Sequence, residues 1–188
     1  MEWIEIRAIM INIRAKKGSK QVIEKLKIQK GDFIADIGSG GGYLTCEFAK
    51  KAGENGRVFA IDTDEKLLKC IDKLIMKKNI QNVRTLVSDE DGVILSKGNC
   101  DLIFMRNVFH HIKDQVAYFK RMKENLKPGG RIAIVEWSNP LIWSHISGTN
   151  HSTPENKICQ VMQEAGFQNT EKFDFLDGQS FNIFKSVD

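Results

Sequence analysis

The chain has 188 residues, of which 41% are hydrophobic and 28% charged, a composition typical of one globular domain that can bury a sizeable core. Its net charge of +4 is mild, and lysine pairs such as Lys50-Lys51 are scattered without interleaved aromatics. This pattern favours solvated surface lysines over nucleic-acid binding. No apolar run approaches the roughly 18 residues of a membrane span, and no secretory signal pattern opens the chain, so we expect a cytoplasmic protein.

Residues 1–17 allow two interpretations. Their isoleucines alternate as in a strand, whereas Ile6, Met10 and Ile13 would also line one face of a helix. A separate amphipathic helix is predicted to begin near Ser19 and to include residues 24–28. The first segment therefore stays open between strand and helix on its pattern alone.

A glycine-rich loop follows the first buried strand. Phe33 to Ile37 has the length and branching of such a strand, and the next five residues contain four glycines. Glycine permits φ > 0 and lets backbone N–H groups approach a ligand where a Cβ would clash. Residues 44–51 then read as a helix, which places the loop at the carboxyl end of the strand, where open α/β sheets bind ligands.

The spacing of charged residues around this loop indicates the ligand. Gly38 and Gly40 fit the dinucleotide fingerprint, but its third small position is occupied by Tyr43. Asp62 ends a second strand, 22 residues after Gly40, where an acid accepts hydrogen bonds from ribose hydroxyls. That feature suits NAD and S-adenosylmethionine alike. Asp36 favours the cationic S-adenosylmethionine over an anionic pyrophosphate, and the alternative is a tight turn that binds no ligand.

The remaining elements alternate between strands and helices. Leu67, Leu68, Ile71 and Leu74 recur at helical spacing after Asp64, as on a core-facing helix. Strands are predicted at 83–87, 100–105 and 131–137, helices at 114–126 and from a Thr153 N-cap with Pro154 as first helical residue, and a terminal hairpin at 167–175 and 179–186. The four cysteines are widely spaced and have no histidine at ligand spacing, so we predict reduced thiols and no metal site.

Several of these segments carry a family resemblance. Residues 36–43 (Asp-Ile-Gly-Ser-Gly-Gly-Gly-Tyr) resemble motif I of the class I S-adenosylmethionine-dependent methyltransferases. Further segments match in order: 59–62, 87–90, 101–112 and 126–131. Within that superfamily, Met105-Arg106-Asn107-Val108 and Val135-Glu136-Trp137-Ser138-Asn139-Pro140 are similar to segments of the ubiquinone/menaquinone-biosynthesis C-methyltransferases. The resemblance spans about residues 18–186.

The resemblance implies one α/β domain over residues 1–188, with a Rossmann-like, doubly wound seven-stranded sheet that is mostly parallel with an antiparallel C-terminal strand. Residues 1–17 are then expected to form a lid or a homodimer contact rather than a strand. The cofactor would be S-adenosylmethionine, leaving as S-adenosylhomocysteine. Its expected contacts are Asp36, Gly38, Ser39, Gly40, Tyr43, Asp62, Thr63, Ser88, Asp89, Glu90, Arg106 and Asn107.

The acceptor side is less defined. A general base is needed only if the acceptor loses a proton, and His110 and His111, just beyond the fourth strand, are the best-placed candidates. Paired histidines there can instead be helix-start residues. Residues 138–152, with Trp143, His145 and His151, are a second wall of the acceptor pocket or a polar loop. We expect a methyltransferase with a small-molecule acceptor. Its rivals are an S-adenosylmethionine-binding protein without catalysis and an NAD-dependent oxidoreductase.

Overall fold

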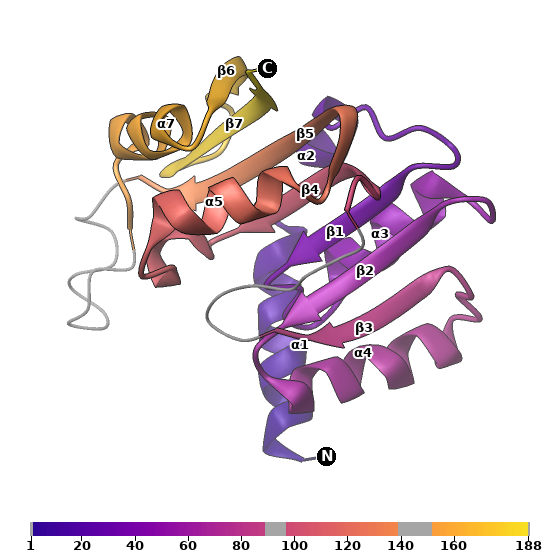
Figure 1. Ribbon diagram of the computed structural model, residues 1–188. Coiled ribbons are helices and arrows are strands. Elements are labelled where there is room, and N and C mark those ends of the chain that lie inside the picture. The colour runs from indigo at the N-terminus through magenta and orange to yellow at the C-terminus, as the bar shows by residue number, and fades with distance from the viewer. Residues whose placement is uncertain (1, 89–96, 139–151, 188) are drawn as a thin grey trace. The chain divides into compact units, whose positions relative to one another are not determined.

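The computed structural model describes residues 2–88, 97–138 and 152–187. Its strands belong to one seven-stranded sheet in the order β3-β2-β1-β4-β5-β7-β6 (Figure 1). Strand β7 runs antiparallel to both of its neighbours, whereas β1, β2 and β3 are parallel, as are β4 and β5. The predicted Rossmann-like fold class is therefore confirmed. The chain divides into two compact units, residues 1–93 and 94–188.

The described part of the first unit, residues 2–88, contains three parallel strands and four helices. In chain order these are α1 (Trp3–Lys16), α2 (Ser19–Lys25), β1 (Phe33–Ile37), α3 (Tyr43–Ala52), β2 (Arg57–Asp62), α4 (Glu65–Lys77) and β3 (Val83–Val87). Asp64 begins α4 as predicted, because its carboxylate caps the helix by accepting the Lys66 N–H at 3.0 Å. The helix buries Leu68 and Ile71 against Ala60 of β2, and these three side chains form part of the core of the first unit.

Helix α1 resolves the ambiguity at the start of the chain, because residues 3–16 are helical and the strand interpretation is wrong. The helix packs on α3 and α4. Two ion pairs tie it to α4 and its cap, Arg7–Asp64 at 2.6 Å and Glu5–Lys73 at 3.0 Å. These exposed pairs each contribute little, so apolar packing and the loop contacts described below hold the helix in place.

In the second unit, helices pack on the part of the sheet that contains the antiparallel strands. Its elements are β4 (Cys100–Arg106), the 3₁₀ turn η1 (Phe109–His111), α5 (Gln115–Lys123), β5 (Leu126–Trp137), α7 (Glu155–Glu164), β6 (Phe167–Phe173) and β7 (Gln179–Ser186). Its core combines aliphatic and aromatic side chains, and the buried rings of Phe109 and Phe119 stack at 5.5 Å between centroids. Packing of Phe109 anchors η1, the turn that carries both candidate histidines.

Several boundaries differ from the sequence prediction: α2 ends at Lys25 instead of including residues up to 28, β4 ends at Arg106 instead of 105, and β6 ends at Phe173 instead of 175. Strand β5 begins at Leu126 instead of Arg131, because Leu126 already pairs with Cys100 before a register shift. Helix α5 ends at Lys123, three residues early. Pro154 is the N-cap of α7 rather than its first residue: its ψ of 139° is extended, and the Thr153 N–H is donated to Trp137 O at 2.8 Å.

Across the described ranges, no helix has the length and hydropathy that crossing a membrane requires. Cys46 and Cys100 are buried thiols, and Cys70 and Cys159 are half-buried. The segment 138–152, which the sequence offers as an acceptor wall or a loop, falls almost entirely outside the described residues, together with Trp143, His145 and His151.

Candidate functional site

The glycine loop is fastened to the end of β2. The N–H groups of Gly38 and Ser39 both donate to Ile61 O, at 2.8 and 3.0 Å. The Gly40 N–H donates to the Asp62 carboxylate at 2.8 Å. Since the loop follows β1 and its partners end β2, the carboxyl ends of two parallel strands form one rigid platform in the first unit.

Two glycines are required because α1 lies directly on the loop. Gly40 has a φ of +56°, and a Cβ built there would lie 2.8 Å from Ile11 Cγ2. A Cβ on Gly41 would lie 2.4 Å from Ala8 O, a backbone atom that cannot turn aside. Only glycine fits between helix and loop at these positions. Helix α1 therefore contacts the loop, while its roles as a lid or a homodimer contact stay predictions.

Asn12 of α1 holds both sides of the loop. Its Nδ2 donates to Gly41 O at 2.8 Å, and its Oδ1 accepts the Tyr43 N–H at 3.0 Å. Tyr43 is the first residue of α3, so this amide oxygen occupies the position where a dinucleotide-binding fold places pyrophosphate. The arrangement disfavours NAD. Asn12 was not found by the sequence analysis, because its partners lie about 30 residues away.

Asp36 is a buried carboxylate beneath the loop. It is 3% exposed, and the Thr45 hydroxyl donates to it at 2.5 Å. Burial raises its pKa to about 7, the Thr45 hydrogen bond opposes that rise, and the charge of Asp62 adds to it. A buried carboxyl of this kind would be relieved by a cation, and the α-ammonium of S-adenosylmethionine supplies one. The residues present therefore fit that cofactor.

The other predicted contacts in the first unit are Asp62 and residues of the loop and of the ends of β2 and β3. Its Oδ1 accepts the Asp64 N–H at 3.0 Å, so each carboxylate oxygen has one backbone donor and keeps a lone pair for a hydroxyl. Ser39 Oγ is buried and has no partner within the described ranges. The Tyr43 hydroxyl lies 3.2 Å from Ser19 Oγ, which directs this side chain to α2. Thr63 is exposed, and the Ser88 N–H donates to Asp62 O at 3.0 Å.

Asp89 and Glu90, the expected adenine contacts, lie outside the described residues. Their role stays a prediction.

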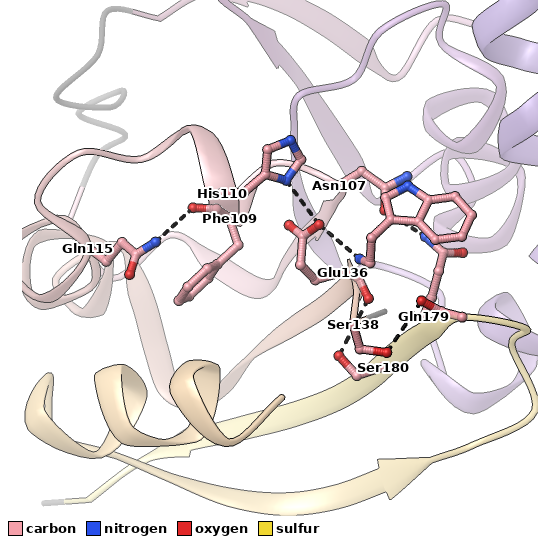
Figure 2. A network of polar contacts seen from close by, with 10 residues as sticks. Asn107, Phe109, His110, Gln115, Glu136, Ser138, Gln179 and Ser180 are labelled. Carbon is pink, nitrogen blue, oxygen red and sulfur yellow. Dashed lines mark hydrogen bonds and ion pairs between the residues drawn. The ribbon is translucent and has the colours of Figure 1, made fainter. Parts of the chain in front are cut away.

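The second unit contains its own polar network at the ends of β4 and β5 (Figure 2). Gln179, the first residue of β7, accepts from Arg106 Nη2 at 2.8 Å and donates to Asn107 Oδ1 at 2.6 Å. Burial lowers the pKa of Arg106, although guanidinium stays charged in proteins. Arg106 and Asn107 thus share a partner that the sequence analysis did not identify, 73 and 72 residues away.

The two candidate histidines differ in their surroundings. His110 Nδ1 lies 3.0 Å from Glu136 Oε1, and the side chains are 8% and 0% exposed. Figure 2 shows the imidazole directed at this carboxylate. His111 is exposed, with its ring centroid 4.0 Å from that of His110. The structure therefore separates a buried histidine with an acidic partner from a surface one.

A mostly parallel seven-stranded sheet with a glycine loop after β1 and an acid at the end of β2 defines a Rossmann-like nucleotide-binding protein. The model of the methyltransferase domain family matches residues 13–177. The chain belongs to this family.

Similar proteins agree with that assignment. The demethylmenaquinone methyltransferase of Lactobacillus johnsonii is 29% identical over 70% of this chain and 54% of its own length. The ubiquinone/menaquinone biosynthesis C-methyltransferase UbiE of Teredinibacter turnerae is 32% identical over 64% of this chain and 49% of its own length. The chain thus spans about half the length of these curated relatives. A crystal structure of a SAM-dependent methyltransferase from Aquifex aeolicus shares the fold, with a TM-score of 0.80, 23% identity and 89% of each chain covered.

Proposed function

We propose that the protein transfers a methyl group from S-adenosylmethionine to a small-molecule acceptor. The observation that carries the proposal is the platform in the first unit, where buried Asp36 lies under a glycine loop whose following helix is capped by Asn12. This arrangement favours a cation, and the N–H of the first residue of the helix is already bonded to Asn12 instead of being available to pyrophosphate. Membership of the methyltransferase domain family supports the same cofactor.

Each acid has a separate role in this proposal. Asp62 accepts hydrogen bonds from the ribose hydroxyls, for which its two oxygens each retain a lone pair. Asp36 stabilises the α-ammonium group. The glycine loop, including Gly38 and Ser39, approaches the ligand with its backbone, and Ser39 Oγ is a buried hydroxyl that a ligand atom could satisfy. The cofactor itself supplies an electrophilic methyl group on a sulfonium.

The acceptor chemistry is proposed from the second unit and from the relatives. The leaving group is a neutral thioether that needs no proton, so the protein works mainly by positioning the acceptor and excluding water. His110 is the proposed base where the acceptor must lose a proton, and its burial beside Glu136 favours it over His111. The names of the relatives point to quinone-type acceptors. A cytosolic location, a homodimer and the absence of nucleic-acid binding stay predictions.

Calorimetry tests the cofactor assignment. S-adenosylhomocysteine should bind the full chain, and NADH at the same concentration should not. Replacement Asp62→Ala should weaken that binding by about 1–3 kcal/mol, since charged hydrogen bonds to hydroxyls are lost. Asp177→Ala, an exposed acid in the second unit, is the matched control and should leave the dissociation constant unchanged. Binding of NADH but not S-adenosylhomocysteine would overturn the proposal.

A further inference from the structure

Glu136 is an ionisable residue in an otherwise apolar part of β5. Its neighbours Ile134 and Val135 are buried, and the Glu136 side chain itself is 0% exposed. Carboxylates are almost never fully buried unless they are paired, because water is lost and must be replaced by donors. The position therefore needs an explanation in terms of its contacts.

Two nitrogen atoms lie within hydrogen-bond distance of the same oxygen of this carboxylate. Oε1 accepts the N–H of Trp137 at 2.9 Å and lies 3.0 Å from His110 Nδ1 (Figure 2). The backbone donor holds the carboxylate in one orientation, since Trp137 is fixed in the ladder opposite Gln179. A carboxylate in its ionised form can only accept, and in that form the proton of this contact resides on Nδ1 of His110.

The second oxygen of Glu136 is also informative. Oε2 is buried and has no hydrogen-bond partner within the part of the chain that the structure describes. Buried acceptors in proteins are generally satisfied by protein, water or ligand. A polar donor on a bound molecule, or a water that accompanies it, is thus expected beside this oxygen.

We propose that Glu136 is a positioning residue that holds His110 as the Nδ1–H tautomer, so that Nε2 of His110 is the base for a methyl acceptor that loses a proton. This inference rests on the proposed function. A neutral imidazole has one protonated and one basic nitrogen, and a partner on one nitrogen decides the role of the other. Glu136 does not touch the acceptor's reacting atom in this arrangement; it acts through the histidine.

The proposed methyl transfer accounts for each bond, electron pair and proton. The nucleophilic atom of the acceptor uses an electron pair to form the bond to the methyl carbon. The carbon–sulfur bond breaks, and its electron pair stays on sulfur, giving a neutral thioether. The proton of the nucleophile passes to Nε2, and the resulting imidazolium is stabilised by the Glu136 carboxylate at Nδ1. Hydroxyl, amine and acidic carbon acceptors fit this scheme, whereas tertiary amines and thioethers have no proton to give.

Nitrogen NMR of the full chain, labelled with ¹⁵N-histidine, measures the tautomer directly. His110→Gln assigns the His110 signals, and His111→Gln, which removes the neighbouring ring, is the control that should leave the His110 tautomer unchanged. In the parent protein, at a pH at which the His110 imidazole is neutral, its single ring proton should be on Nδ1. Glu136→Leu, which fills the volume without an acceptor, should shift the proton to Nε2, the commoner site in free histidine. If Glu136→Leu does not fold, Glu136→Asp keeps the charge, withdraws the oxygens by one methylene and should cause the same shift.

An Nε2–H tautomer for His110 in the parent protein overturns the inference, as does an unchanged Nδ1–H tautomer in a folded Glu136→Leu or Glu136→Asp variant. A purely structural Glu136 would alter stability without moving this proton. Calorimetry with S-adenosylhomocysteine on the same samples separates the two proposals. If S-adenosylhomocysteine binds but His110 is the Nε2–H tautomer, only the role of Glu136 is contradicted. If His110 is the Nδ1–H tautomer but S-adenosylhomocysteine does not bind, only the cofactor assignment is contradicted.

Discussion

At the scale of single residues, the described ranges contain two buried acids whose burial is compensated by different partners. Glu136 has a histidine and a backbone N–H, whereas Asp36 has the Thr45 hydroxyl and a raised pKa of about 7. The sequence predicted Asp36 because it lies two residues before the first glycine of the loop. Glu136 was missed as a site residue, since its partner His110 is 26 residues away and nothing local marks the pair.

Asp36→Asn should stabilise the ligand-free protein at high pH. The folded-state pKa lies above the ordinary value of 3.8, so this carboxyl's stabilising contribution is complete below about pH 4 and is lost as the pH rises through about 7. The amide cannot ionise and keeps an acceptor for Thr45. Urea unfolding at pH 8 should therefore show a gain of up to about 4 kcal/mol over the parent, which disappears near pH 4.

The same substitution should weaken binding of S-adenosylhomocysteine, because the α-ammonium loses its counter-charge. A substitution that raises stability but weakens binding identifies an acid that is kept for binding at a cost in stability. Thr85→Val, whose hydroxyl is bonded to Asp72 outside the loop, is a control for polar replacement in the same unit. An Asp36→Asn variant that is no more stable than the parent at pH 8 would show that burying the ionised carboxylate does not destabilise the fold.

At the scale of elements, helices and strands with strong periodicity were predicted closely. The predicted β3 coincides with the observed strand, Val83–Val87, and α4 begins after Asp64 as expected. Helix α1 could not be chosen over a strand from its pattern, because its apolar residues are spread around the helix and Ile9, Met10 and Ile13 are exposed. What fixes α1 is its tertiary contact with the loop, which a local pattern does not contain.

Asn12→Ala should loosen α1 from the glycine loop. Both hydrogen bonds to the loop are lost, to Gly41 O and from the Tyr43 N–H, and this should weaken S-adenosylhomocysteine binding by about 1–2 kcal/mol. Hydrogen exchange of the Tyr43 amide should accelerate at the same time. Asn156→Ala, the same change at an exposed position of α7, should alter neither quantity. Unchanged exchange at Tyr43 in the Asn12 variant would mean that α1 does not hold the loop.

At the scale of the whole molecule, the sheet order follows from the family resemblance more than from any single strand. Periodicity located the strands, but the pairing of β5 with β7 joins residues about 50 apart, such as Ala133 and Ile183. Long-range polar partners could not be predicted from local sequence patterns either. Gln179 was predicted only as the first residue of a hairpin strand, yet it is hydrogen-bonded to both Arg106 and Asn107. A single domain over residues 1–188 stays a prediction beside the two compact units.

Cofactor binding should appear as a gain in stability of the folded chain. A ligand that binds only the native state at 100 times its dissociation constant adds about 2.7 kcal/mol. For a chain of this length that gain corresponds to a rise in Tm of about 5–10 °C. Differential scanning calorimetry should show this rise with S-adenosylhomocysteine and none with NADH at equal concentration. Asp62→Ala should need a higher concentration of S-adenosylhomocysteine for the same rise, because the ribose contact and the hydrogen bond from the Gly40 N–H are both lost. A rise with NADH alone would place pyrophosphate at the start of α3, in conflict with the cap that Asn12 provides there.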